Sequence, residues 1–210
     1  GTGHVDDLLL KRVLYGISCR NYETAAAAIP GAIGLSSSTV SRTFTRASAQ
    51  QLQALQERDL HPLDVMAVFL DGKTFADMTM VIAVGITLTG EKHILGFVET
   101  GTENEAVLTP FLQGLGDRGL DVSKGLLVII DGGKGLRAAV RQAFGAAALV
   151  QRCQWHKREN VVRHLPKGEQ AHWRTRLQRA YRQPTYKQAR TALVRLQRDL
   201  EARNQSAARS

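Results

Sequence analysis

Two aspartates stand at the ends of matching apolar runs. Residues 68–70 lead into Asp71, residues 128–130 lead into Asp131, and a glycine follows each aspartate. Central apolar strands tend to be parallel neighbours, so we expect both carboxylates to emerge at one edge of a sheet. Two carboxylates held together repel each other unless a cation lies between them, and hard oxygen ligands favour Mg²⁺ or Mn²⁺. The pair therefore predicts a metal site, although either aspartate alone would indicate only a turn.

Cys153-x-x-His156 has the spacing of half a zinc site, but no second Cys/His pair has ligand-like spacing. We therefore expect Cys153 to be a small buried side chain and His156 to be hydrogen-bonded near the candidate site. The Gly-rich stretch at residues 131–135 lacks the spacing of a nucleoside triphosphate loop, which excludes that function. Lys134 within it is still placed to contact a DNA phosphate.

The residues around these groups are predicted to form strands and helices in succession. Apolar runs and turn residues predict a mixed α/β sheet in the order β-β-β-α-β-α-β-α, flanked by helices. Pro110 is expected to weaken the first of these helices. The predicted strands are residues 65–70, 79–88, 92–99, 125–130 and 148–151, and the predicted helices are residues 103–115, 135–144 and 154–164. Residues 169–205 predict further basic helix, broken at Gln183-Pro184.

The net charge of +9 is unevenly distributed along the 210 residues. Residues 1–150 hold 13 Lys/Arg and 15 Asp/Glu, a balance of −2, whereas residues 151–210 hold 15 and 4, a balance of +11. A basic segment on a neutral body indicates a polyanionic partner, most often nucleic acid; a solvated Arg-rich helical face is the alternative. Near the Cys-His motif, we expect DNA contacts from Arg152, Lys157 and Arg158.

Residues 5–58 have helical periodicity interrupted by Pro30-Gly31. A short helix, a Gly-containing turn and a Ser/Thr/Arg-rich helix form the pattern of a helix-turn-helix, whose second helix lies in the major groove of DNA. A plain helical hairpin would show a similar pattern. The residues expected to reach phosphates or base edges are Ser37, Ser38, Thr39, Ser41, Arg42 and Arg46.

Several protein classes are excluded or disfavoured by composition. No apolar run is long enough to span a bilayer, and residues 1–20 do not have the pattern of a secretory leader. Two cysteines far apart do not form a disulfide framework, so a reducing cytoplasm is expected. Because residue 1 is Gly rather than Met, we expect the chain to be a piece of something longer.

These motifs together resemble bacterial Mutator-type insertion-sequence transposases over roughly residues 10–165. The resemblance is carried by Phe69-Leu70-Asp71, by residues 128–132, by residues 151–160 with Cys153-x-x-His156, and by the Ser-rich stretch at residues 34–42. It implies an RNase H-like catalytic domain with an Asp-Asp-Glu triad and two divalent metals, Mg²⁺ or Mn²⁺. Asp71 matches the first acid and Asp131 the second. It also implies an all-helical insertion before the glutamate, and self-association of the complete enzyme in the bacterial cytoplasm, in association with the nucleoid.

One departure from the family pattern concerns the third acid. Glu159, Glu169 and Glu201 all precede the position where the family places its glutamate. We therefore expect this chain to bind DNA and to bind metal weakly, without strand cleavage above background.

The sequence predicts three regions: residues 1–61 bind DNA, residues 62–165 form the RNase H-like core, and residues 166–210 begin the insertion. The expected function is a transposase that binds element ends and target DNA and catalyses phosphodiester cleavage and strand transfer. A non-enzymatic helix-turn-helix regulator with an α/β sensing domain is the competing class, and an RNase H-like nuclease is the nearer alternative among enzymes.

Overall fold

The computed structural model describes residues 46, 49–75, 78–101 and 104–210, and the chain divides into two compact units, residues 1–58 and 59–210. In the first unit, Arg46 and residues 49–57 are helical. The other predicted DNA-contacting residues of this unit lie outside the described residues: Ser37, Ser38, Thr39, Ser41 and Arg42.

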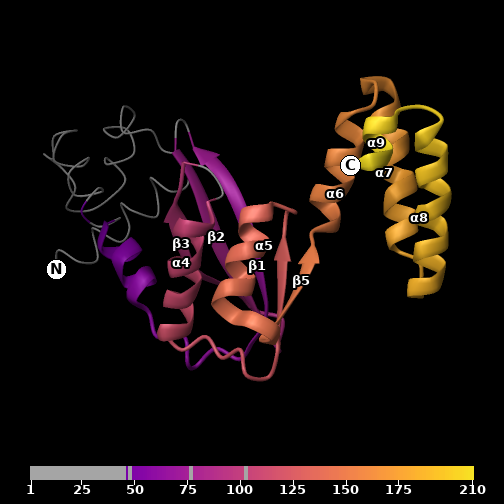
Figure 1. The fold of residues 1–210 in the computed structure, drawn as a ribbon. Coiled ribbons are helices and arrows are strands. Elements are labelled where there is room, and N and C mark those ends of the chain that lie inside the picture. The colour runs from indigo at the N-terminus through magenta and orange to yellow at the C-terminus, as the bar shows by residue number, and fades with distance from the viewer. Residues whose placement is uncertain (1–45, 47–48, 76–77, 102–103) are drawn as a thin grey trace, which may run out of the picture. The chain divides into compact units, whose positions relative to one another are not determined.

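The second unit contains a five-stranded mixed sheet in the order β3-β2-β1-β4-β5 (Figure 1). Its antiparallel half is a meander in which β1 pairs with β2 and β2 with β3, and its parallel half adds β4 to β1 and β5 to β4. The mixed α/β class and the element order predicted from the sequence are thereby confirmed. The strands are β1 (Val65–Phe75), β2 (Met78–Thr87), β3 (Lys92–Glu99), β4 (Leu126–Ile130) and β5 (Ala148–Arg152).

β1 runs five residues further than the sequence predicts, since the strand was expected to end at Leu70. Asp and Gly are residue types that are depleted in strands. Asp71 and Gly72 nevertheless remain paired with β2, opposite Ile82 and Val81. The pairing with β2 continues to Phe75, beyond the last residue that pairs with β4. The antiparallel partner therefore outweighs the local preference for a turn.

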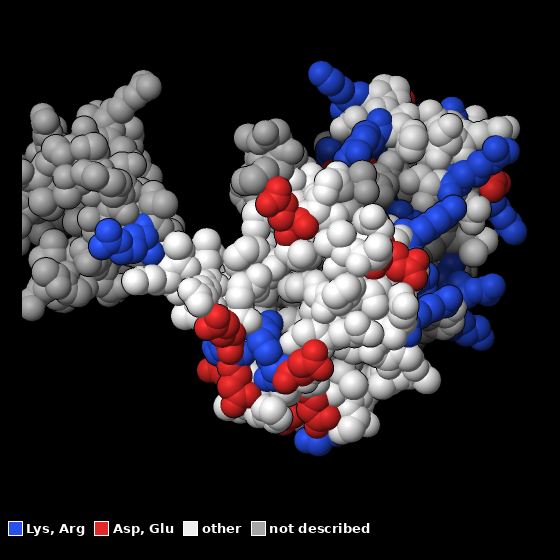
Figure 2. All heavy atoms as spheres, turned by 60° about the vertical axis from the view of Figure 1, so that its left-hand side comes forward, with Lys and Arg blue, Asp and Glu red and all other residues white. Residues whose placement is uncertain are grey.

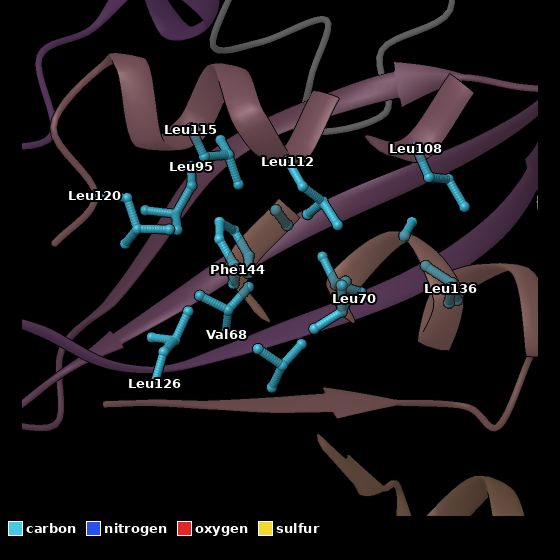
Figure 3. Close-up of a cluster of buried hydrophobic side chains, with 14 of the residues drawn as sticks. Val68, Leu70, Leu95, Leu108, Leu112, Leu115, Leu120, Leu126, Leu136 and Phe144 are labelled. Carbon is cyan, nitrogen blue, oxygen red and sulfur yellow. The ribbon is translucent and has the colours of Figure 1, made fainter. Parts of the chain in front are cut away.

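Two helices, α4 (Glu105–Asp117) and α5 (Lys134–Phe144), pack with the sheet around one hydrophobic core (Figure 3). α4 begins at Asn104, whose side chain accepts a hydrogen bond from the Ala106 amide, and it continues through Pro110. Its apolar stripe explains this continuity, because Leu108, Leu112 and Leu115 are fully buried at helical spacing. The opposite face of the sheet is apolar but partly exposed, with Phe69, Leu127 and Leu149 at 40%, 39% and 71% exposure.

Residues after the sheet form four helices around a second hydrophobic core. The helices are α6 (Gln154–Arg163), α7 (Lys167–Tyr181), α8 (Tyr186–Glu201) and α9 (Gln205–Arg209). Trp173 is the largest buried side chain of this core, and it packs with Val161 and Val162 of α6 and with Leu196 and Leu200 of α8. The predicted break at Gln183-Pro184 is confirmed, because α7 ends at Tyr181 and α8 begins after the Thr185 cap. No helix in the described residues is both long and apolar enough to cross a membrane.

Candidate active site

The two aspartates directly follow the last residue pair that joins the neighbouring parallel strands β1 and β4. Leu70 of β1 is the register partner of Ile130 of β4, so the next residue along each strand is Asp71 and Asp131. Successive side chains along a strand alternate between faces, which places Asp71 on the same face as Phe69, away from the buried Leu70. The parallel arrangement expected from the matched apolar runs is thus present, and it brings both backbones to one edge of the sheet.

Asp71 faces the first turn of α6. Its Oδ1 lies 3.5 Å from Nε2 of His156, and the two side chains are 34% and 28% exposed. The His156 ring also stands edge-on to Trp155, with 4.9 Å between the ring centroids. His156 thus lies beside Asp71, and its Nδ1 is buried without a hydrogen-bond partner among the described residues.

Asp131 is held in a tight turn between β4 and α5. Its Oδ1 accepts a hydrogen bond from the Gly133 amide at 2.8 Å, and its backbone oxygen accepts one from Nε of Arg152 at 3.3 Å. Gly132 has φ of +111°, and a Cβ placed there would lie 2.6 Å from Nε of Arg152. This turn therefore requires glycine for both its backbone conformation and the close approach of the arginine.

A shallow pocket of about 280 Å³ opens beside Asp71 on the partly exposed face of the sheet. Its apolar floor follows one row of the sheet, because Val84 and Ile129 are the register partners of Phe69 on either side. Its polar rim comes from β1, β3 and the β5–α6 junction. The rim residues are Asp71, Lys92, Cys153 and His156.

Two helices begin at this edge of the sheet with their N-terminal amides uncapped by side chains. α5 follows β4 with Gly133 as its N-cap, α6 follows β5 with Cys153 as its N-cap, and neither helix has an acidic residue in its first turn. Free amides and the positive end of the helix dipole favour an anion such as phosphate at these positions.

The donors at this edge suit a hard cation. Two carboxylates, completed by water and substrate phosphate oxygens, are a usual protein contribution to a Mg²⁺ site. Within the described residues no group of three or more His, Cys, Asp or Glu side chains could hold a metal ion. Any cation bound by Asp71 and Asp131 would therefore need further ligands from outside the described side chains.

A family model described as "Transposase, Mutator family" matches residues 2–210. The chain belongs to this family.

Relatives of this Mutator-family chain include insertion-sequence transposases from several bacteria. The transposase for element IS256 in transposon Tn4001 of Staphylococcus aureus is 36% identical over 118 residues, 56% of this chain and 30% of the relative. The transposase for IS6120 of Mycolicibacterium smegmatis is 30% identical over 74% of this chain and 49% of the relative. A probable transposase of Corynebacterium diphtheriae is 29% identical over 90% and 56%. The matches thus span between about a third and just over half of these relatives.

The Lys and Arg residues predicted to contact DNA differ in their exposure and in their hydrogen-bond partners. Arg46 and Lys134 are exposed. Arg152 and Lys157 both donate to the backbone oxygen of Ser210. Burial, and secondarily the charge of Arg152, lower the pKa of Lys157.

Arg158, in contrast, is mostly buried among the helices α6 and α7, where its side chain is hydrogen-bonded. Its side chain is only 17% exposed, its Nε donates to Glu159 Oε1 at 3.0 Å, and its Nη1 donates to Gln178. Glu159 also receives a hydrogen bond from Nε of Arg174 at 2.9 Å, which links α6 to α7. These contacts join Arg158 and Glu159 to α7, and a contact of Arg158 with DNA stays a prediction.

Another acid considered for the third position, Glu169, is ion-paired as well. Its Oε2 lies 2.9 Å from Nη1 of Arg203, between the first turn of α7 and the residues after α8. This contact accounts for an acidic residue at the start of a helix without any metal.

Sequence reasoning missed Lys92 at the rim of the pocket. Lys92 is the first residue of β3, and the meander brings it opposite Ile86 of β2. Its position depends on the register of two strand pairs, and no local motif marks it. The only signal available was its place at the start of a hairpin strand.

Proposed function

We propose that this chain supplies the DNA-binding part and two metal-binding carboxylates of an insertion-sequence transposase with an RNase H-like core. The observation that carries the proposal is the in-register pairing of Leu70 with Ile130, which puts Asp71 and Asp131 after equivalent positions of adjacent parallel strands. Membership of the Mutator family supports the same chemistry. DNA at element ends and in the target is the proposed substrate.

In this proposal Asp71 and Asp131 hold Mg²⁺ or Mn²⁺ through their carboxylate oxygens. When bound, such ions would supply activation of a water or a 3′-hydroxyl and stabilisation of the leaving oxygen of a phosphodiester. The scissile phosphate lies near the uncapped N-termini of α5 and α6, with Lys134 at the first position of α5. His156 orients the Asp71 carboxylate, and the apolar side chains around Phe69 line the pocket beside it.

Metal binding is tested by thermal unfolding with and without Mn²⁺. A roughly tenfold excess of Mn²⁺ over its Kd stabilises the folded chain by about 1.4 kcal/mol, which raises Tm by about 3–6 °C for a protein of this size. Asp71→Asn or Asp131→Asn should abolish the shift, whereas Asp117→Asn, at an exposed acid that ends α4, should retain it. An equal shift in all four proteins, or no shift in the wild type, contradicts the metal site and favours the non-enzymatic regulator.

Strand cleavage requires more anionic ligands than these two aspartates, and the resemblance places the family's glutamate after a helical insertion. We therefore expect this chain to show Mn²⁺-dependent nicking of an end-bearing duplex only at background. Robust nicking that is abolished by Asp71→Ala would contradict this expectation. Loss of such nicking in Glu169→Gln as well would identify Glu169 as the third ligand despite its ion pair with Arg203.

A further inference from the structure

The most basic part of the chain is a continuous stretch without acidic residues. Residues 170–198 contain eight Lys or Arg and no Asp or Glu. They form most of α7, the turn at Pro184 and most of α8. Figure 2 shows Lys and Arg gathered on one side of the view, whereas the middle of that face carries few charges. A local excess of one charge of this kind attracts a polyanion.

Helix spacing gathers three of these cations into one row on α8. Lys187, Arg195 and Arg198 lie within about 80° of each other around the helix axis, and Thr191 lies between them. All four side chains are exposed, and we call them the α8 stripe. Leu196, which packs in the helical core, points about 100° or more away from each of them. The stripe therefore faces away from the core that holds α8 in place.

The cations of the stripe are not neutralised within the described part of the chain. Acids of the helical region are bound by other arginines, as Glu159 is by Arg174 and Asp199 is by Arg176. The three cations of the stripe make no ion pair with any described residue. The stripe ends about one turn before Glu201. Its positive charge is thus left for a ligand.

A groove of about 430 Å³ runs beside the stripe at the turn between α7 and α8. Three residues of the stripe line it together with neutral side chains, which are Gln183, Gln188 and Ala192. The side-chain oxygen of Gln188 accepts a hydrogen bond from the Thr185 hydroxyl at 2.9 Å, and its NH₂ group has no hydrogen-bond partner among the described residues. Gln and Thr side chains contact the DNA backbone together with Lys and Arg. The groove therefore adds neutral donors for phosphate oxygens to the charges of the stripe.

The shape and composition of the stripe favour a DNA duplex over a single strand. Lys187 and Arg198 are about 16 Å apart along the axis of one helix, so the row is straight and can follow a stiff rod that carries one phosphate charge per about 1.7 Å. Single-strand sites add aromatic side chains on which bases stack, but no residue that lines the stripe or the groove is aromatic. Tyr186 is exposed, but it points about 100° or more away from every residue of the stripe.

We propose that the α8 stripe binds the sugar-phosphate backbone of duplex DNA, with phosphates on Lys187, Arg195 and Arg198. Because phosphates carry no base information directly, this binding is independent of base sequence. The proposal rests on DNA being the substrate of this chain, as argued above. It goes further by assigning duplex binding to one face of a helix that carries neither aspartate of the candidate active site.

The test measures binding of the whole chain to a labelled duplex by fluorescence anisotropy over a range of salt concentrations. Lys187→Gln/Arg195→Gln/Arg198→Gln should reduce the salt slope by about 2.7, since each neutralised phosphate of B-DNA contributes about 0.9, and should lower affinity roughly a hundredfold at about 0.1 M salt. A duplex of unrelated sequence should show the same losses. With a single strand of the same length the slope should fall by no more than about 2.1, because each phosphate contributes about 0.7.

A control variant removes the same charge from other exposed positions. Arg163→Gln/Lys167→Gln/Arg190→Gln also takes two arginines and one lysine, from α6, α7 and the flank of α8. It should lose much less affinity, because these residues lie outside the stripe. A charge-conserving exchange within the stripe, Lys187→Arg/Arg195→Lys/Arg198→Lys, should retain both affinity and salt slope.

Equal losses in the stripe variant and the control variant, or a comparable loss in the charge-conserving exchange, would overturn the α8 stripe while leaving DNA as the substrate. A greater loss of affinity for the single strand than for the duplex would overturn duplex DNA as the occupant. So would a greater loss for an RNA duplex of the same sequence. If the wild-type chain does not bind duplex DNA, the proposed function fails together with the stripe.

Discussion

The sheet and the helices α6–α9 are built on different physical principles. The sheet core joins residues that are far apart in sequence, such as Val68, Leu112 and Leu136, and it positions two carboxylates at one edge. The helical core joins neighbouring helices around Trp173. Residues 151–210 carry a charge of +11, whereas residues 1–150 carry −2. The sheet thus places a few groups precisely, whereas the positive charge of the helices attracts a polyanion.

The sharpest test of this division is removal of the central side chain of the helical core. Trp173 is 1% exposed, so Trp173→Ala should cost about 3–5 kcal/mol of unfolding free energy. Hydrogen exchange should show loss of amide protection in α6–α9, with β1 and β4 remaining protected. Trp155→Ala, at a tryptophan that is 54% exposed, serves as the control and should change protection little. Equal loss of protection in the sheet would mean that the two cores unfold as one.

The reciprocal change removes a buried side chain from the sheet core. Leu95 of β3 is fully buried, and Leu95→Ala should cost about 3 kcal/mol. The loss should appear as faster hydrogen exchange in β1–β3, with the fluorescence of Trp173 unaltered. Leu149→Ala is the matched control, because Leu149 is 71% exposed on the opposite face of the sheet. A similar cost in both variants would show that the exposed face is covered in solution.

Gly132→Ala tests the turn that holds Asp131. Its positive φ should cost about 1–2 kcal/mol, and displacement of Arg152 should add about 1 kcal/mol by breaking its hydrogen bond to the Asp131 backbone. Gly90→Ala provides the control, because Gly90 also has positive φ but a Cβ there would meet nothing within 4 Å. Urea unfolding of both variants isolates the arginine contact. Equal destabilisation would mean that Arg152 does not support the turn.

The smallest effect concerns the ion pairs of Glu159. Burial raises the pKa of this carboxyl, but hydrogen bonds and charges from Arg174 and Arg158 outweigh it and lower the pKa below 4.5. A carboxyl with a lowered folded-state pKa stabilises the protein above its unfolded pKa and loses this effect as pH falls through the folded value. Glu159→Gln should therefore cost about 1 kcal/mol at pH 7, since Arg174 is partly exposed. The difference from wild type in urea unfolding should shrink below pH 4.5, and a constant difference would contradict the ion-pair account.

The sequence predicted elements well where local pattern and tertiary pairing agree. The strand at residues 92–99 and the break at Pro184 match the structure. It failed where tertiary contacts outweigh local preference, as at Asp71 and Gly72, which remain in β1 because β2 pairs with them.

For the candidate site, two matched motifs were sufficient to predict the parallel pairing of the segments that lead into Asp71 and Asp131. The contacts of Arg152 with the Asp131 turn and of Arg174 with Glu159 were not predictable, because each joins residues that are 15 or more positions apart without a motif. The predicted boundaries at residues 61 and 165, and the assignment of the metal-binding residues, stay predictions.

The crossover that joins β1 to β4 also determines when the site comes into existence. The register partners Leu70 and Ile130 are 60 residues apart, whereas β1, β2 and β3 follow one another directly. Local hairpins form before distant parallel pairings, because closing a long loop costs entropy that only the finished contacts offset. During synthesis the edge of β1 that pairs with β4 therefore stays unpaired until β4 emerges, and an unpaired strand edge exposes the nascent chain to aggregation. The same delay keeps Asp71 and Asp131 apart until the sheet is complete, so an incompletely folded copy would lack the paired carboxylates of the proposed metal site.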